Sequence, residues 1–312
     1  MKSSPVQKNN LKRGRPGRSC LKSVLFVLIS VSLILLVLAV GVVYLQVVQL
    51  TTPGRNRDIG KLPGMSYQDV TLITADGLKL SAWYVPGTRP EAIILVHGIH
   101  ANRAYLIPQA VVLAGAGYHL LLLDLRGHGL SEGTIVSYGG REALDVEAAV
   151  DYLAALPEIE HIGALGHSLG GAAVVRAAAD DPRLEALVIQ SSYSSLARVV
   201  EESFNKFALL PKWPFAPLII ALAEFRTGVT ASQINSTRDL AMMPARPVLI
   251  IHGADDSLFP ARYAQAMYDA AQRPKELWII DRTGGHVNPI TGHEAEYSDR
   301  VLKFFEQAFA YE

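Results

Sequence analysis

The apolar residues of this chain form two kinds of pattern, one near the N-terminus and one along the rest. From Val24 to Leu45 there are 22 consecutive residues without a charge, mostly Val, Leu and Ile. At about 1.5 Å per residue, a helix of that length crosses a hydrocarbon core of about 30 Å. The pattern therefore predicts one transmembrane helix, which we place within residues 23–50.

Short, continuously apolar runs recur further along the chain. Runs that are apolar on both faces are typical of strands in a buried parallel sheet. Two earlier β-like runs flank Asp76-Gly77, a strong hairpin signal. The predicted strands are Val70–Thr74, Leu78–Val85, Ala92–Val96, Leu120–Asp124, Ile162–Gly166, Ala186–Gln190, Val248–His252 and Leu277–Ile280.

Helical patterns lie between several of these runs. Arg141–Leu156 has the clearest amphipathic spacing, and Gly171–Ala179 and Pro260–Ala271 also resemble helices. A hairpin followed by alternating strands and helices predicts an α/β fold with a mostly parallel open sheet and helices on both faces.

One connection is too long for a simple loop. More than 50 residues separate the strand ending near Gln190 from the one starting near Val248, and they carry many bulky apolar groups. A segment of this length is usually functional. We predict an insertion at about 193–245, either a lid or a packed helical pair with no gating role.

Charge is distributed unevenly, although the formal net charge is zero. Residues 1–57 hold nine Lys and Arg and no acid, which leaves 20 basic and 29 acidic residues in 58–312. The acidic bulk lacks the basic face of a nucleic-acid-binding protein. Seven basic residues precede the apolar run, so the positive-inside bias predicts a cytoplasmic N-terminus and an extracytoplasmic domain.

A cleaved signal peptide is the rival interpretation of the apolar run. Signal peptides have a shorter apolar core that ends at a small-residue cleavage site, and no such site follows Leu45 here. We therefore predict a basic tail (1–22), an uncleaved anchor (23–50), a linker rich in Pro, Gly and charge (51–65) and a domain spanning 66–312.

A nucleophile motif follows one predicted strand. Gly166-His167-Ser168-Leu169-Gly170 fits G-x-S-x-G and lies between a strand and a helix, the context that a nucleophile elbow requires. A serine hydroxyl needs a base and an orienting carboxylate. Ser168 is therefore the candidate nucleophile.

Candidates for the other catalytic groups follow later strands. Asp255 and Asp256 both come after the strand at Val248–His252, and His286 follows the last strand, which favours it over His293 as the base. An oxyanion hole needs two backbone N–H groups, and Leu169 and Ile99 are the candidates.

Composition and motifs exclude several other chemistries. A single cysteine excludes a disulfide framework and Cys-based metal sites. No H-E-x-x-H spacing is present and no G-x-G-x-x-G opens the turn at Gly166. We therefore expect neither a catalytic metal nor a cofactor.

Together these motifs resemble the α/β-hydrolase superfamily, in particular its membrane-anchored, serine-aminopeptidase-like and acyl-hydrolase-like bacterial members. The resemblance covers nearly all of residues 66–312 and includes His97-Gly98, Arg126-Gly127-His128-Gly129 and Gly285-His286. It implies an eight-stranded sheet with a helical lid. It also assigns the triad carboxylate to Asp256 and a structural role to Asp124.

The predicted function is therefore a serine hydrolase with the triad Ser168, Asp256 and His286. The apolar insertion and the anchor favour a small or lipid-like acyl substrate, so an esterase or lipase is expected first and a peptidase second. A non-catalytic binding module is the alternative outside enzymes. A dehalogenase is disfavoured because it would need Asp at position 168, whereas perhydrolysis stays open.

Overall fold

The chain divides into two compact units, Met1–Leu45 and Gln46–Glu312. The computed structural model describes residues 18–207, 210–282, 285–286 and 290–310. In the first unit these residues belong to helix α1 (Arg18–Thr51), whose apolar side chains there are mostly exposed. By length and composition, Leu21–Thr51 could cross a membrane, although a signal sequence would have the same character.

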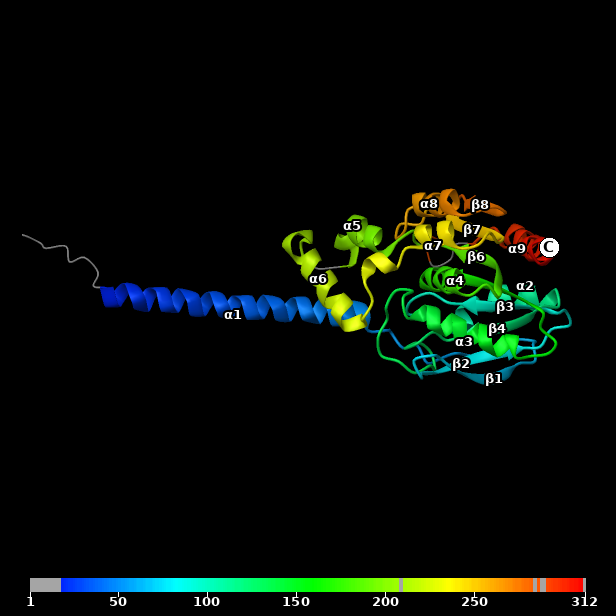
Figure 1. The fold of residues 1–312 in the computed structure, drawn as a ribbon, viewed down its shortest axis with the longest axis horizontal. Coiled ribbons are helices and arrows are strands. Elements are labelled where there is room, and N and C mark those ends of the chain that lie inside the picture. The colour runs from blue at the N-terminus through cyan, green and yellow to red at the C-terminus, as the bar shows by residue number, and fades with distance from the viewer. Residues whose placement is uncertain (1–17, 208–209, 283–284, 287–289, 311–312) are drawn as a thin grey trace, which may run out of the picture. The chain divides into compact units, whose positions relative to one another are not determined.

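The second unit is built on an eight-stranded sheet in the order β1-β2-β4-β3-β5-β6-β7-β8. β1 and β2 form an antiparallel hairpin, β2 runs antiparallel to β4, and the remaining neighbours are parallel (Figure 1). The sequence prediction of a mostly parallel sheet is confirmed. The strands are β1 (Gln68–Ile73), β2 (Lys79–Val85), β3 (Glu91–Val96), β4 (His119–Leu123), β5 (His161–His167), β6 (Leu184–Gln190), β7 (Val248–Gly253) and β8 (Lys275–Ile280).

Helices cover both faces of this sheet, as predicted. On one face, α3 (Glu142–Ala154), α4 (Leu169–Asp180) and α8 (Arg262–Ala270) pack over one apolar cluster. On the other, α2 (Ile107–Gly115) and α9 (Glu294–Phe309) enclose a second cluster. Because apolar side chains point to both faces of each parallel strand, the strand sequences are continuously apolar.

The long connection between β6 and β7 contains helices of two kinds. α7 (Ser236–Met242) packs on α4 and α8 and so belongs to the body of the fold. Before it come α5 (Leu196–Phe207), α6 (Lys212–Thr227) and the short 3₁₀ helix η2 (Ala231–Gln233). α5 and α6 lie outside the helical layers of the sheet (Figure 1). A lid is defined by movement, so the lid stays a prediction.

The segment predicted as a linker packs along the second unit. Thr51, Pro53 and Leu62 are buried. The side-chain amide of Asn102 donates to the backbone carbonyls of Asn56 and Asp58, at 3.2 and 3.0 Å. These contacts bring part of the segment next to the loop that follows β3.

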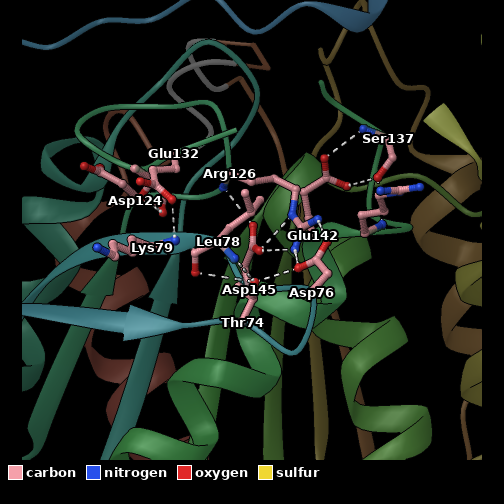
Figure 2. A network of polar contacts seen from close by, with 12 residues as sticks. Thr74, Asp76, Leu78, Lys79, Asp124, Arg126, Glu132, Ser137, Glu142 and Asp145 are labelled. Atoms are coloured by element: carbon pink, nitrogen blue, oxygen red, sulfur yellow. Dashed lines mark hydrogen bonds and ion pairs between the residues drawn. The ribbon is translucent and has the colours of Figure 1, made fainter. Parts of the chain in front are cut away.

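A polar network joins the β1–β2 turn to the loop after β4 and to α3. The Arg126 guanidinium donates to both oxygens of Asp76, at 2.8 and 3.1 Å, and its Nε donates to buried Asp145 at 2.8 Å (Figure 2). Beside it, Glu142 accepts hydrogen bonds from Ser137 and Gly139. The network fixes the turn that holds Arg126-Gly127-His128-Gly129.

Asp76 should therefore contribute stability that depends on pH. The Arg126 hydrogen bond outweighs the effect of partial burial and lowers the pKa of Asp76 to about 2, from 3.8. Such a group stabilises the fold above its unfolded pKa, and the contribution is lost as the pH falls towards 2. Because the carboxylate is partly exposed, we expect Asp76→Asn to cost about 1 kcal/mol at pH 7.

Urea unfolding of the wild type and of Asp76→Asn, measured at several pH values, tests this prediction. The difference in unfolding free energy should shrink as the pH falls below about 4. A difference that stays constant with pH would show that the substitution acts through the shape of the turn and not through its charge.

Candidate active site

Ser168 occupies the sharp turn between β5 and α4. Its backbone has φ of 54° and ψ of −115°, a conformation that a residue with a side chain rarely adopts. The Ser168 N–H donates to Gln190 O at 2.9 Å, and its carbonyl accepts from the Ser192 hydroxyl at 2.8 Å. The neighbouring strand therefore holds the strained turn in place and fixes the direction of the hydroxyl.

The glycines of the motif are required by close backbone approach. A Cβ on Gly166 would lie 2.5 Å from the carbonyl oxygen of Gly170. A Cβ on Gly170 would lie 2.2 Å from the carbonyl oxygen of Val96, at the end of β3. Side chains at either position would force the strand and the helix apart, so G-x-S-x-G is here a packing requirement of the turn.

Three side chains that were predicted from separate parts of the sequence meet at this turn. His286 Nε2 lies 2.9 Å from Ser168 Oγ, and His286 Nδ1 lies 2.7 Å from Asp256 Oδ2. Both distances are within hydrogen-bonding range. Because the carboxylate can only accept, His286 Nδ1 carries a proton, which leaves Nε2 free to accept from the serine.

The two candidate carboxylates lie in different environments. Asp255 is exposed, whereas Asp256 is buried and its Oδ1 accepts from the N–H groups of Leu258 and Phe259, at 2.9 and 2.8 Å. Burial opposes ionisation of Asp256, but the contact with His286 and the Phe259 N–H outweigh it and hold the pKa of this carboxyl below its usual range. The side chain is thus a charged, oriented acceptor.

The two candidate histidines also occupy different places. His286 is partly buried beside Ser168, and the ring of Phe259 meets it edge-on at 4.9 Å. His293 directly precedes α9, and its Nε2 donates to the carbonyl oxygen of Asp281 at 3.0 Å. Only His286 is within reach of the Ser168 hydroxyl for proton transfer.

Ile99 and Leu169, the predicted oxyanion-hole donors, lie beside the Ser168 turn. Leu169 is the first residue of α4, where backbone N–H groups have no acceptor within the helix. In the part of the chain that the structure describes, neither N–H has a hydrogen-bond acceptor. A Cβ on Gly98 would lie 3.2 Å from the Ser168 Cβ, so the loop that carries Ile99 lies against the elbow.

A buried, neutral imidazole holds that loop. Burial, reinforced by neighbouring His128, lowers the pKa of His97 to about 3. Its Nδ1 donates to the carbonyl oxygen of Gly98 at 2.7 Å, and its Nε2 accepts from the Leu125 N–H at 3.2 Å. His97 therefore links the candidate oxyanion loop to the loop after β4.

The Ser168 hydroxyl opens into a pocket of about 540 Å³, within the usual range for small-molecule sites. Tyr105 and His167 form part of its wall, with the Tyr105 hydroxyl 3.2 Å from His167 Nε2. Burial, with the nearby His286 adding to it, lowers the pKa of His167 to about 3, so this ring is neutral. The pocket lining includes no Lys or Arg among the described residues.

One wall of the pocket was not predicted from the sequence. Asn56 and Asp58, from the segment predicted to be a linker, line it beside the loop after β3. Gly54 N–H donates to His100 Nδ1 at 3.0 Å and reinforces this contact. Single hydrogen bonds across more than 40 residues leave no periodic pattern, so the sequence carried no signal for them.

Asp58 should therefore influence which charged substrates enter. We expect Asp58→Lys to lower kcat/KM for an ester with a cationic group, relative to a neutral ester of equal size, by about 5-fold, since an exposed charge pair contributes up to about 1 kcal/mol. Glu160→Lys is the matched control, because Glu160 is exposed and precedes the amino end of β5, away from the pocket. Equal preferences in both variants would exclude a role for Asp58.

Comparisons with known proteins identify relatives of this chain. Residues 88–222 match the family model described as serine aminopeptidase, S33. The uncharacterized protein Rv2307c of Mycobacterium tuberculosis is 31% identical over 245 residues, which cover 77% of this chain and 79% of that protein. The uncharacterized protein YfhR of Salmonella typhi is 27% identical over 276 residues, 82% of this chain and 86% of that protein.

Solved structures with the same fold include esterases. The Pyrococcus furiosus esterase Pf2001 superposes with a TM-score of 0.68 at 27% identity, covering 82% of this chain and 99% of that chain. Est1E from Butyrivibrio proteoclasticus, solved with ferulic acid, gives 0.61 at 21% identity, with 77% and 100% covered. At that lower identity the likeness concerns the fold alone.

Proposed function

This chain belongs to the α/β-hydrolase superfamily, and on that premise we propose that it is a serine hydrolase that cleaves carboxylic esters through an acyl-enzyme intermediate. The single observation that carries the proposal is the continuous hydrogen-bonded path from Ser168 Oγ through His286 to Asp256. The esterase fold neighbours support an ester as the substrate class.

The first half of the reaction forms the acyl-enzyme. His286 Nε2 accepts the proton from Ser168 Oγ as that oxygen bonds to the substrate carbonyl carbon. The carbonyl oxygen becomes negative and accepts hydrogen bonds from the N–H groups of Ile99 and Leu169. The bond to the leaving alcohol then breaks, and that alcohol takes the proton from His286.

The second half releases the acid. A water molecule attacks the acyl carbon and gives a proton to His286 Nε2, which returns it to Ser168 Oγ as the ester bond to the enzyme breaks. Asp256 keeps the proton on His286 Nδ1 and stabilises the cationic ring in both halves. Each oxyanion donor is typically worth about 3–4 kcal/mol of barrier.

Labelling with a fluorophosphonate probe tests the nucleophile directly. The full chain should be labelled covalently at Ser168, and Ser168→Ala should not react. Ser298→Ala is a suitable control, since the Ser298 hydroxyl donates to the Glu294 carbonyl within α9 and Ser298 does not line the pocket. Equal labelling of the wild type and of Ser168→Ala would refute the proposed mechanism.

A serine aminopeptidase is the second candidate, because the matching family model carries that description. The same acyl-transfer steps would then act on an N-terminal peptide bond. Parallel assays with p-nitrophenyl esters and aminoacyl p-nitroanilides distinguish the two. Hydrolysis of the anilides at rates comparable to the esters would favour the peptidase.

We further propose that α1 anchors the protein, with the N-terminus in the cytoplasm and the hydrolase unit on the other side. The length and apolar composition of Leu21–Thr51 support this proposal, as do the seven basic residues that precede the apolar run. We expect full-length mass in the membrane fraction, and we expect protease added outside an intact plasma membrane to digest the hydrolase unit. A mature protein lighter by the mass of this segment would show a cleaved signal instead.

A further inference from the structure

Helix α6 carries apolar residues on its exposed side as well as on its buried side. Its inward face includes buried Ala216 and Ile219. Its outward face repeats at helical spacing through Pro214, Leu218 and Phe225 and also includes Pro217 and Ala221, all of them exposed. We call these five residues the α6 stripe. A helix that is apolar all round is normally buried in a protein core or in a membrane.

Two large apolar side chains at this surface are almost fully exposed to solvent. Phe225 is 89% exposed, and Trp213, which precedes the helical turns, is 80% exposed. No charged residue belongs to the stripe; Lys212 and Arg226 lie at the two ends of the helix, and half-buried Glu224, next to Phe225, accepts from the Ala231 N–H. An apolar face bounded by cations and by a tryptophan is typical of a helix at a membrane surface.

Contacts within the second unit place this surface beside the end of α1. Arg226 Nε donates to Thr51 Oγ1 at 2.8 Å, and Thr51 is the last residue of α1. The Tyr138 hydroxyl donates to the Leu50 carbonyl at 2.6 Å, and Val136 N–H donates to the Thr51 carbonyl at 2.8 Å. Val47 and Thr51 are buried, so the last turn of α1 is fixed to the hydrolase unit.

The position of the stripe relative to a membrane follows from the continuity of the chain through α1. Val24–Leu45 is long enough to fill a hydrocarbon core, so Gln46–Thr51 leaves the bilayer at its interface. The C-terminal end of α6 is hydrogen-bonded to the residue at which α1 ends. We propose that the α6 stripe, with Trp213, inserts into the lipid interface of the bilayer that α1 spans, as a second membrane contact. This inference rests on the proposed anchor but not on the proposed chemistry.

Fluorescence quenching by brominated lipid tests the proposal on the full chain. The chain has three tryptophans, of which Trp83 and Trp278 are at most 9% exposed. In phosphatidylcholine vesicles, brominated acyl chains should quench the emission of Trp213. Trp213→Phe should abolish that quenching, and Phe225→Trp in the Trp213→Phe background should restore it.

The matched control is Ile73→Trp in the same Trp213→Phe background. Ile73 is 59% exposed on the edge strand β1, opposite Lys79, and lies outside the stripe. Its tryptophan should not be quenched. Equal quenching at positions 73 and 225, or none at 213 and 225, would overturn the proposal. Emission from Trp213 that shifts to the blue with protein concentration, without quenching, would assign the stripe to a second copy of this chain.

The experiment also separates this inference from those on which it is built. A chain that fails to sediment with vesicles refutes the proposed anchor. A chain that sediments but shows no quenching at Trp213 refutes only the stripe. Neither result depends on hydrolysis, so loss of the proposed esterase activity would leave the measurement intact.

Discussion

Replacing Ser168 by alanine is expected to lower kcat for ester hydrolysis by about 10⁶-fold, with little change in KM. The hydroxyl is the bond-forming atom, and the donors of Ile99 and Leu169 can lower the barrier only for a nucleophile that is present. Replacing His286 by alanine should cost a similar factor, because without Nε2 the hydroxyl has no base. Rates for both variants are measured on a soluble p-nitrophenyl ester under saturating conditions.

The double variant is the sharper measurement. Groups that act in one chain of proton transfer are strongly non-additive, so Ser168→Ala combined with His286→Ala should be no slower than either single variant. Losses that multiply would mean that the two side chains act independently, and the hydrogen bond between them would then have no catalytic meaning.

Ser168→Gly provides a structural control for the same position. The backbone of Ser168 is held at φ of 54°, which glycine tolerates far better than serine or alanine. We expect the free energy of unfolding of Ser168→Gly, measured in urea, to exceed that of Ser168→Ala by about 1–2 kcal/mol. Both variants should be inactive. Inactivity combined with higher stability would separate the loss of chemistry from misfolding.

Much of this fold could be predicted because parallel strands buried on both faces must be continuously apolar. The runs ending near Val96, Gly166 and His252 mark where strands end, and the loops that bear Ile99, Ser168 and Asp256 follow them. Helix α2 was not predicted. Its nine residues are nearly all apolar, so they show no polar face from which helical periodicity could be recognised.

Some residues of the candidate site could likewise be predicted from the sequence, and others could not. Ser168 stands in a motif whose glycines are forced by backbone contacts, so the sequence itself carries the constraint. Asp255 and Asp256 differ by one position, and spacing alone left both open until the resemblance to a family favoured Asp256. Asn56 and Asp58 reach the pocket through Asn102 and His100, and such isolated contacts between distant residues have no sequence signature.

Substitution of each of the two adjacent aspartates tests which carboxylate orients His286. We expect Asp256→Asn to reduce kcat by about 10⁴-fold, or about 5.5 kcal/mol of barrier, while Asp255→Asn stays close to the wild type. The two variants remove the same charge one residue apart, but only Asp256 lies 2.7 Å from His286 Nδ1. Steady-state rates on one ester are sufficient for the comparison.

The reason for so large an effect lies in the proton on the imidazole. Oδ1 of Asp256 accepts from Leu258 and Phe259, so an asparagine there would keep its oxygen in that place and turn its amide donors towards His286. The ring would then accept at Nδ1 and carry its proton on Nε2, facing a serine that it can no longer deprotonate. Because the pKa of Asp256 is held below its usual range, the wild type keeps this carboxylate charged at pH values well below neutral. A similar loss in Asp255→Asn, or little loss in Asp256→Asn, would mean that the imidazole is oriented by some other group.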